Sequence, residues 1–215
     1  MYRIIGYYIC ELIEIPRYLG RTGTMVSVSG CFGGTHPRLD VCFFTNNYTD
    51  AKERDAYKKL WNLSGEKAQQ LSKEINGLFG NGLDTDGRFI CLSDARRFYD
   101  SYFSNGNCII VSVSSEEKYF DILKGELGNN SCGLTFDKTG CMDENELLGF
   151  DILGWDIGIF HSFLCNGLQK MLTGVRFNDY GLLGNTFDET AAFSCQIQGL
   201  GEPVEWIPCR IGRCI

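Results

Sequence analysis

The sequence lacks any long apolar run. No stretch approaches the roughly 18 consecutive apolar residues that a membrane-spanning helix needs, so we expect no membrane partner. The segment Met1–Ile15 is apolar, but it carries Glu11 and Glu14 and no small-residue cleavage site follows it. These features favour a strand over a signal peptide. We therefore expect a cytoplasmic protein.

Histidine is scarce, and the common catalytic motifs are absent. Cysteine–histidine catalysis would have to use His36 or His161, yet no nucleophile signature and no Gly-x-Ser-x-Gly pattern occurs. The glycine-rich loop Gly30–Thr35 lacks the lysine of a phosphate-binding loop. Asp84–Gly87 lacks the first and last ligands of an EF-hand, which favours an Asp-Gly turn. We expect a protein without catalysis or cofactor, and an enzyme without a recognisable motif stays open as an alternative.

Cysteine is abundant, but paired metal-binding cysteines are missing. The 11 cysteines are odd in number and scattered, and no Cys-x-x-Cys occurs. Buried free thiols in a reducing compartment explain this usage. His161 and Cys165 are four residues apart on an expected helix, and Cys209 and Cys214 lie near the end of the chain. Since the spacing between these pairs matches no zinc signature, we interpret them as packing residues and expect no bound metal.

Positive charge is in short supply in the second half of the chain. Residues 1–110 hold 13 basic and 12 acidic side chains, whereas residues 111–215 hold 7 basic and 15 acidic ones, a net charge of −8. An acidic half repels phosphate backbones, so direct nucleic-acid binding is excluded from our interpretation. It attracts a basic partner and speeds encounter with it, although charge of this kind also serves solubility alone.

Apolar periodicity predicts an α+β fold in which a mixed sheet and about five or six helices surround one main core. We expect a single domain over 1–215, with a possible subdomain joint in the Gly-, Asn- and Asp-rich stretch 128–144. The expected strands and extended segments cover 2–13, 24–29, 39–45, 89–92, 108–113 and 203–211. The expected helices cover 50–64, 66–79, 93–103, 114–127, 159–172 and 188–198, with Ser93 and the Ser114/Glu117 pair as N-terminal caps.

The densest run of acids begins within this predicted joint. Loops beside a rigid scaffold are where recognition usually occurs, and this stretch has no apolar period, so we expect its carboxylates to be exposed. The predicted partner-binding residues are Asp137, Asp143, Glu144 and Glu146. Asp151 and Asp156 lie among large apolar side chains, and we therefore expect them to have structural roles instead.

Two segments in the C-terminal third, Gly154–Asn166 and Gly201–Pro208, carry a family resemblance. They resemble segments of small cytoplasmic bacterial immunity proteins of polymorphic-toxin and contact-dependent inhibition systems. The resemblance implies a protein that binds its cognate toxin and performs no catalysis, and it assigns no contact residues. We expect an immunity protein that neutralises a basic toxin by direct binding. The alternative is an interaction or structural protein whose partner is not a toxin.

Overall fold

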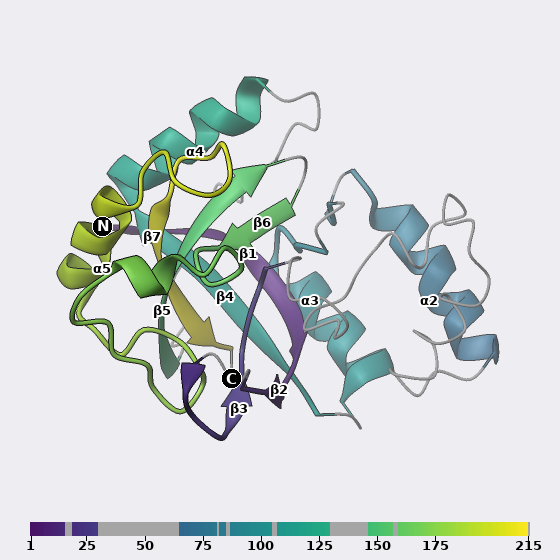
Figure 1. Cartoon of the computed structure of the whole chain (residues 1–215). Coiled ribbons are helices and arrows are strands. Elements are labelled where there is room, and N and C mark those ends of the chain that lie inside the picture. The colour runs from purple at the N-terminus through teal and green to yellow at the C-terminus, as the bar shows by residue number, and fades with distance from the viewer. Residues whose placement is uncertain are drawn as a thin grey trace.

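The computed structural model describes most of the chain (Figure 1). The described ranges are 1–15, 19–29, 65–80, 82–84, 87–104, 107–129, 146–156 and 159–214, without the side chains of 124–129. The predictions for the strand at 39–45, for the helix at 50–64, and for His36 and Gly30–Thr35 lie outside these ranges. So does most of the joint predicted at 128–144.

A five-stranded sheet, curled and antiparallel throughout the described pairs, forms the centre of the fold. Its order is β1-β4-β7-β5-β6, and β2 pairs with β3 separately. The strands are β1 (Tyr2–Glu11), β2 (Ile13–Glu14), β3 (Thr24–Met25), β4 (Cys108–Glu116), β5 (Glu146–Asp156), β6 (Ile159–Ser162) and β7 (Ile207–Arg213). The prediction of α+β is confirmed, whereas the expected mixed sheet is wrong because every described strand pair is antiparallel.

Four α-helices occur in the described ranges, fewer than the five or six that we expected. They are α2 (Gly65–Leu78), α3 (Leu92–Phe98), α4 (Glu117–Asn129) and α5 (Phe187–Gln196), to which a π-helical turn η3 (Tyr99–Phe103) and a 3-10 turn η4 (Leu168–Met171) are added. No described helix has both the length and the apolar character that crossing a bilayer requires.

Two of the predicted helix caps are wrong, and one that was not predicted is present. The N-cap of α3 is Cys91, not Ser93, and it makes no side-chain capping bond. Ser114 pairs with Arg210 inside the sheet, because β4 continues to Glu116. The capping box instead opens α5, where the Thr186 hydroxyl accepts the amide N–H of Glu189.

The helices cover both faces of the sheet, as the alternating directions of the side chains along β4 show. Cys108 and Ile110 pack in one cluster with Leu92 and Phe98 of α3. Their neighbours Ile109, Val111 and Val113 pack in another cluster with residues of α4. Successive side chains of a strand point to opposite faces, so α3 and α4 lie on opposite sides of β4 (Figure 1). A third cluster joins β5 and the segment before β7 to α5 through Ile152, Trp206 and Phe193, among others.

The helix predicted over 159–172 is wrong. Ile159–Ser162 forms strand β6, which pairs with the end of β5, and turns and η4 follow it. The apolar period that suggested a helix still marks buried positions, since Phe160, Leu164 and Leu168 are all buried. Pairing with β5 decides the conformation, because propensity and period are weaker than tertiary context over such a short segment.

A buried arginine, Arg88, joins the segment that precedes α3 to the edge strand β1. Arg88 is 1% exposed, pairs with Asp84 (Nε–Oδ2 2.7 Å) and donates from Nη1 to the carbonyl of Ile5 at 2.6 Å. A Cβ on Gly6 would lie 2.6 Å from Cδ of Arg88, so only glycine fits beneath this side chain. The amide N–H of Gly87 donates to the Asp84 carbonyl at 3.1 Å, which confirms the predicted Asp-Gly turn.

Gly154 of β5 provides a test of the packing between β5 and the segment that leads into β7. A Cβ at this position would lie 2.8 Å from Cβ of Val204. We expect Gly154→Ala to lower the free energy of unfolding by about 1–3 kcal/mol through overpacking, measured by urea denaturation. Adding Val204→Ala should make the loss in the double variant smaller than the sum of the two single losses.

The matched control is Gly77→Ala in α2, where an added Cβ meets no atom within 4 Å. Helix propensity predicts a gain of up to about 1 kcal/mol there. Equal losses at the two glycines would contradict the packing described for Gly154.

Candidate functional site

Of the four residues predicted to bind a partner, one lies in the described ranges. Glu146 begins β5, and its side chain is 51% exposed, so its expected exposure is confirmed. It lies opposite Arg213 of β7, and the Oε2–Nη1 distance is 3.7 Å. Asp137, Asp143 and Glu144 lie outside the described residues. The binding role of all four stays a prediction.

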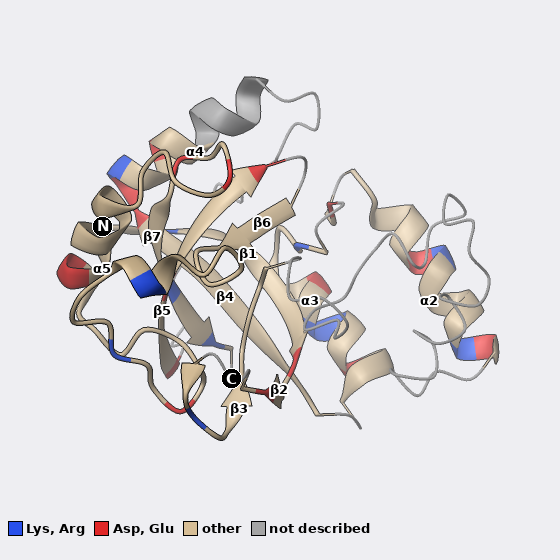
Figure 2. Cartoon of the chain, viewed as in Figure 1, with Lys and Arg blue, Asp and Glu red and all other residues tan. Residues whose placement is uncertain are grey.

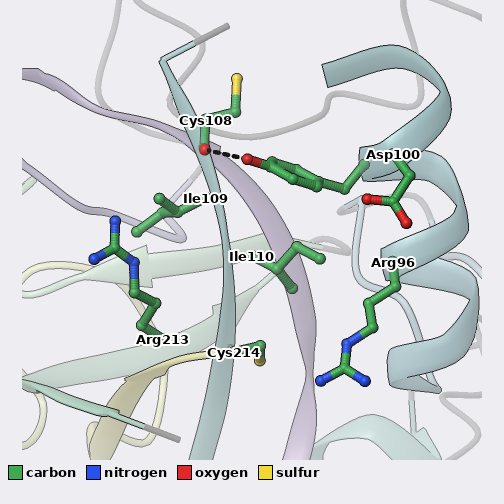
Figure 3. A pocket seen from close by; sticks show the side chains of 8 residues that line it. Arg96, Asp100, Cys108, Ile109, Ile110, Arg213 and Cys214 are labelled. Carbon is green, nitrogen blue, oxygen red and sulfur yellow. Dashed lines mark hydrogen bonds between the residues drawn. The ribbon is translucent and has the colours of Figure 1, made fainter. Parts of the chain in front are cut away.

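A cavity of about 300 Å³ lies beside this end of the sheet (Figure 3). The pairing of β4 with β7 covers Val111–Ser114, so the first three residues of β4 extend past the end of that ladder. The space beside them is closed by the end of α3 and by η3. Its lining residues are Arg96, Tyr99, Asp100, Cys108, Ile109, Ile110, Arg213 and Cys214.

Two hydrogen bonds hold the walls of the cavity together. The Tyr99 hydroxyl donates to the carbonyl of Cys108 at 3.2 Å and thereby ties η3 to β4 (Figure 3). The amide N–H of Cys214 donates to the carbonyl of Ile110 at 3.0 Å and extends the contact of β7 with β4 by one residue. π-helical turns are rare in proteins overall, but those that occur are frequently found at functional sites. The π-helical turn η3 is therefore, beside the cavity itself, a second sign that this region is functional.

The polar groups of the cavity are suited to binding rather than to bond breaking. Arg96 and Arg213 contribute guanidinium groups and Asp100 contributes a carboxylate, around an apolar surface from Ile109 and Ile110. Burial raises the pKa of the Cys108 thiol to about 12, with a further contribution from Glu11. Since the thiolate is the nucleophilic form, this cysteine is not activated at neutral pH.

A zinc site and a cysteine–histidine catalytic pair were the two alternatives that involved His161. The described residues show no geometry that supports either of them. His161 is buried on β6, outside the lining of the cavity, and its Nδ1 lies 4.0 Å from Oε1 of Glu202. Cys165 follows in a turn rather than on a shared helix face, and its Sγ lies 2.9 Å from Oγ of Ser29. Within the described ranges no cluster of three or more His, Cys, Asp or Glu could hold a metal ion.

The first aspartate of the motif region is buried in the sheet. Asp151 is 3% exposed, and its Oδ1 accepts bonds from the Ser162 hydroxyl and from the amide N–H of Ile152, both at 2.8 Å. Burial raises its pKa to about 7 despite these bonds. The carboxyl thus joins β5 to the end of β6, a structural role as expected, although it caps no helix. Asp156 ends β5 and is partly buried.

Sequence reasoning missed the cavity because its residues come from three distant segments with no shared spacing. Arg96 and Asp100 looked like the ordinary surface of an amphipathic helix, and Tyr99 like part of its apolar face. Cys108–Ile110 looked like any β-branched strand, and Arg213 and Cys214 like a chain end. The sole sequence signal was Glu146, whose cross-strand neighbour lines the cavity.

No family model matches the sequence, and comparison with curated proteins and with solved structures finds no similar chain. The function therefore has to be argued from the chemistry of these residues.

The buried carboxyl of Asp151 predicts a distinctive pH dependence of stability. Its folded-state pKa of about 7 lies above its ordinary value of 3.8, so its contribution to stability is present at low pH and is lost as pH rises through 7. We expect Asp151→Asn, which keeps an acceptor for Ser162, to raise the free energy of unfolding at pH 8 by about 1–3 kcal/mol relative to wild type.

This difference between the variant and wild type should shrink as pH falls toward 4, in chemical denaturation series. Asp156→Asn, at the partly exposed end of the same strand, serves as the control and should follow the wild-type profile. An Asp151→Asn variant less stable than wild type at every pH would contradict a raised pKa of the Asp151 carboxyl in the folded state.

The raised pKa of Cys108 predicts a slow reaction with alkylating agents. At pH 8 we expect iodoacetamide to modify Cys108 at least about a hundredfold more slowly than the exposed Cys195 of α5, measured by peptide mass spectrometry. Rapid and selective modification of Cys108 would show instead that the cavity contains an activated thiolate, and would support an enzymatic function.

Proposed function

We propose that the chain is a protein-binding immunity protein that neutralises a cognate, basic bacterial toxin by direct binding. Three features support this proposal: the net charge of −8 over residues 111–215, the resemblance of Gly154–Asn166 and Gly201–Pro208 to such proteins, and the exposed acid at the start of β5. Many growth-inhibiting toxins act on nucleic acid and are basic, so an acidic inhibitor can cover their substrate-binding surface.

The observation that carries the proposal is the position of Glu146. It ends the acidic stretch that begins at Asp137, and it lies at the rim of the cavity through its contact with Arg213. The next residue, Leu147, is 47% exposed. An exposed apolar side chain beside charged groups and a recess is the combination found in protein interfaces, where an apolar centre is surrounded by a polar rim.

Acidic side chains also begin two of the helices, α4 with Glu117 and α5 with Asp188 and Glu189 (Figure 2). Glu117 pairs with Arg3, and Glu189 pairs with Arg176. Those acids are therefore partly neutralised, and their position also stabilises the helix ends. The start of β5 remains the better candidate for recognition, because it adjoins both the acidic stretch and the cavity.

A binding protein whose partner is not a toxin is the second candidate. Exposed large apolar side chains favour it, since such side chains support any protein interface. In the described ranges these are Met1, Phe79, Ile122, Leu147 and Met171. The identity of a co-purified partner distinguishes the two candidates.

The direct test is affinity purification of the tagged chain from its native host, followed by co-expression of the captured partner. A basic partner that stops growth alone, and no longer does so with this chain, would establish the immunity function. Capture of a housekeeping complex, with no growth protection, would favour the second candidate. No partner at micromolar concentration would end both proposals.

Charge reversal at the start of β5 should act on association with that partner. We expect the triple variant Asp143→Lys, Glu144→Lys and Glu146→Lys to associate about tenfold more slowly at low salt and to lose most of its salt dependence, because exposed interface charges steer encounter. Stopped-flow or surface plasmon resonance measures both quantities. Thermal stability should stay nearly unchanged, since Glu146 makes only a loose, exposed ion pair.

Glu205→Lys provides the matched control. Glu205 is exposed in the same acidic half, but it precedes Ile207, at the end of β7 opposite to Arg213. This single reversal should change association much less than Glu146→Lys alone does. If the two single variants behave alike, the partner responds to total charge and the start of β5 is not the recognition surface.

A further inference from the structure

The guanidinium group of Arg213 has more hydrogen-bond donors than acceptors around it. A guanidinium carries five N–H donors. The contact with Glu146 at 3.7 Å is an ion pair beyond hydrogen-bond distance, and no hydrogen bond to the Arg213 side chain exists in the described part of the chain. The side chain is nevertheless only 38% exposed. A half-buried guanidinium with unused donors is suited to a ligand that supplies paired acceptors.

The surroundings of this guanidinium are apolar on one side. Ile109 and Ile110 of β4 line the same cavity, together with the thiols of Cys108 and Cys214. Figure 3 shows Arg213 beside Ile109, with Arg96 and Asp100 across β4 on the side of α3. A ligand held by Arg213 would therefore place its remaining atoms first against Ile109, on the side of β4 away from Arg96 and Asp100.

The volume limits what can enter. About 300 Å³ is at the lower end of the range for small-molecule sites, enough for a branched aliphatic group and one planar anionic group. Carboxylate and phosphate groups both accept two parallel hydrogen bonds from a guanidinium fork. Two carboxylates, Glu146 and Asp100, already lie at the edges, so the site is close to neutral and favours a ligand with a single negative charge.

From this geometry we infer that the cavity binds a monocarboxylate with a short branched apolar body, anchored by Arg213. This chemistry belongs equally to a free branched-chain acid and to the C-terminal residue of a peptide. The inference goes beyond the proposed function and does not depend on a toxin partner. Glu146 competes for the same guanidinium and is displaced from it when the ligand binds.

The test uses 4-methylpentanoate as the probe and its neutral amide as the matched control. Binding is followed by the ¹³C-methyl NMR signals of Ile109 and Ile110 in the full chain. We expect saturable shifts with a Kd of about 1–10 mM for the acid, as suits a ligand of this size. The amide should bind on the order of tenfold more weakly or not at all.

Two substitutions at the rim should change this affinity in opposite directions. Arg213→Met should weaken binding of the acid on the order of tenfold or more, because it removes the charge-assisted bonds. Glu146→Gln should strengthen binding about two- to threefold, since it removes the competing carboxylate. Arg176→Met, at an exposed arginine that pairs with Glu189 and does not line the cavity, is the control and should bind as wild type does.

Opposite effects of these two variants cannot come from a merely structural role of the ion pair, because breaking the pair from either side would then act alike. Should Arg213→Met fail to fold, Glu146→Gln and the comparison of acid with amide still decide the matter. Equal binding of acid and amide, absence of saturable shifts at Ile109 and Ile110, or weaker binding by Glu146→Gln would each overturn the inference.

A further arm distinguishes the two sources of the carboxylate. A short peptide ending in leucine is compared with the same peptide carrying a C-terminal amide and with the free acid. A peptide that binds at least tenfold more tightly than 4-methylpentanoate, and loses this advantage on amidation, identifies a protein C-terminus as the ligand. Equal or weaker binding by the peptide identifies a small free acid.

Discussion

The central position of β7, between β4 and β5, is the constraint on which the rest of the structure depends. The last strand of the chain pairs on one side with β4, from the middle of the sequence, and on the other with β5. This register places Arg213 opposite both Val111 and Glu146. A slip of one residue would turn every side chain of β7 to the other face and would move Arg213 from the α4 side of the sheet to the α3 side. The ladder therefore determines both the core and the chemistry at its end.

Local patterns predicted the elements that local interactions determine. The helices at 66–79 and 93–103 followed from their apolar stripes, and α5 from its acidic first turn. The strand at 108–113 followed from β-branched residues. By contrast, Ile159–Ser162 forms a strand because β5 lies beside it, and no pattern within the segment encodes that neighbour. Ser114 looked like a helix cap because its spacing to Glu117 is correct, but its pairing with Arg210 is a long-range contact.

The candidate site also combines features that local sequence patterns predict with features that only long-range contacts create. Exposure of Glu146 was predictable, because an acidic stretch without apolar period stays in water. The cavity was not, because Arg96, Ile110 and Arg213 come together only through the placement of β7 beside β4. The interior and the rim also differ in charge: burial raises the pKa of Asp151 and of the Cys108 and Cys209 thiols. These buried groups favour their neutral forms, whereas Glu146 and Arg213 lie at the rim, where a partner can meet them.

Amide hydrogen exchange of the complex tests most directly whether this end of the sheet is a protein-binding surface. With a captured partner bound, we expect added protection at residues 146–149 of β5 and 211–214 at the end of β7. Helix α2, which packs on the other side of the sheet from α4, should exchange as in the free chain. Protection confined to α2 or to the N-terminal turns of α4 and α5, with the start of β5 unchanged, would contradict the proposed recognition surface.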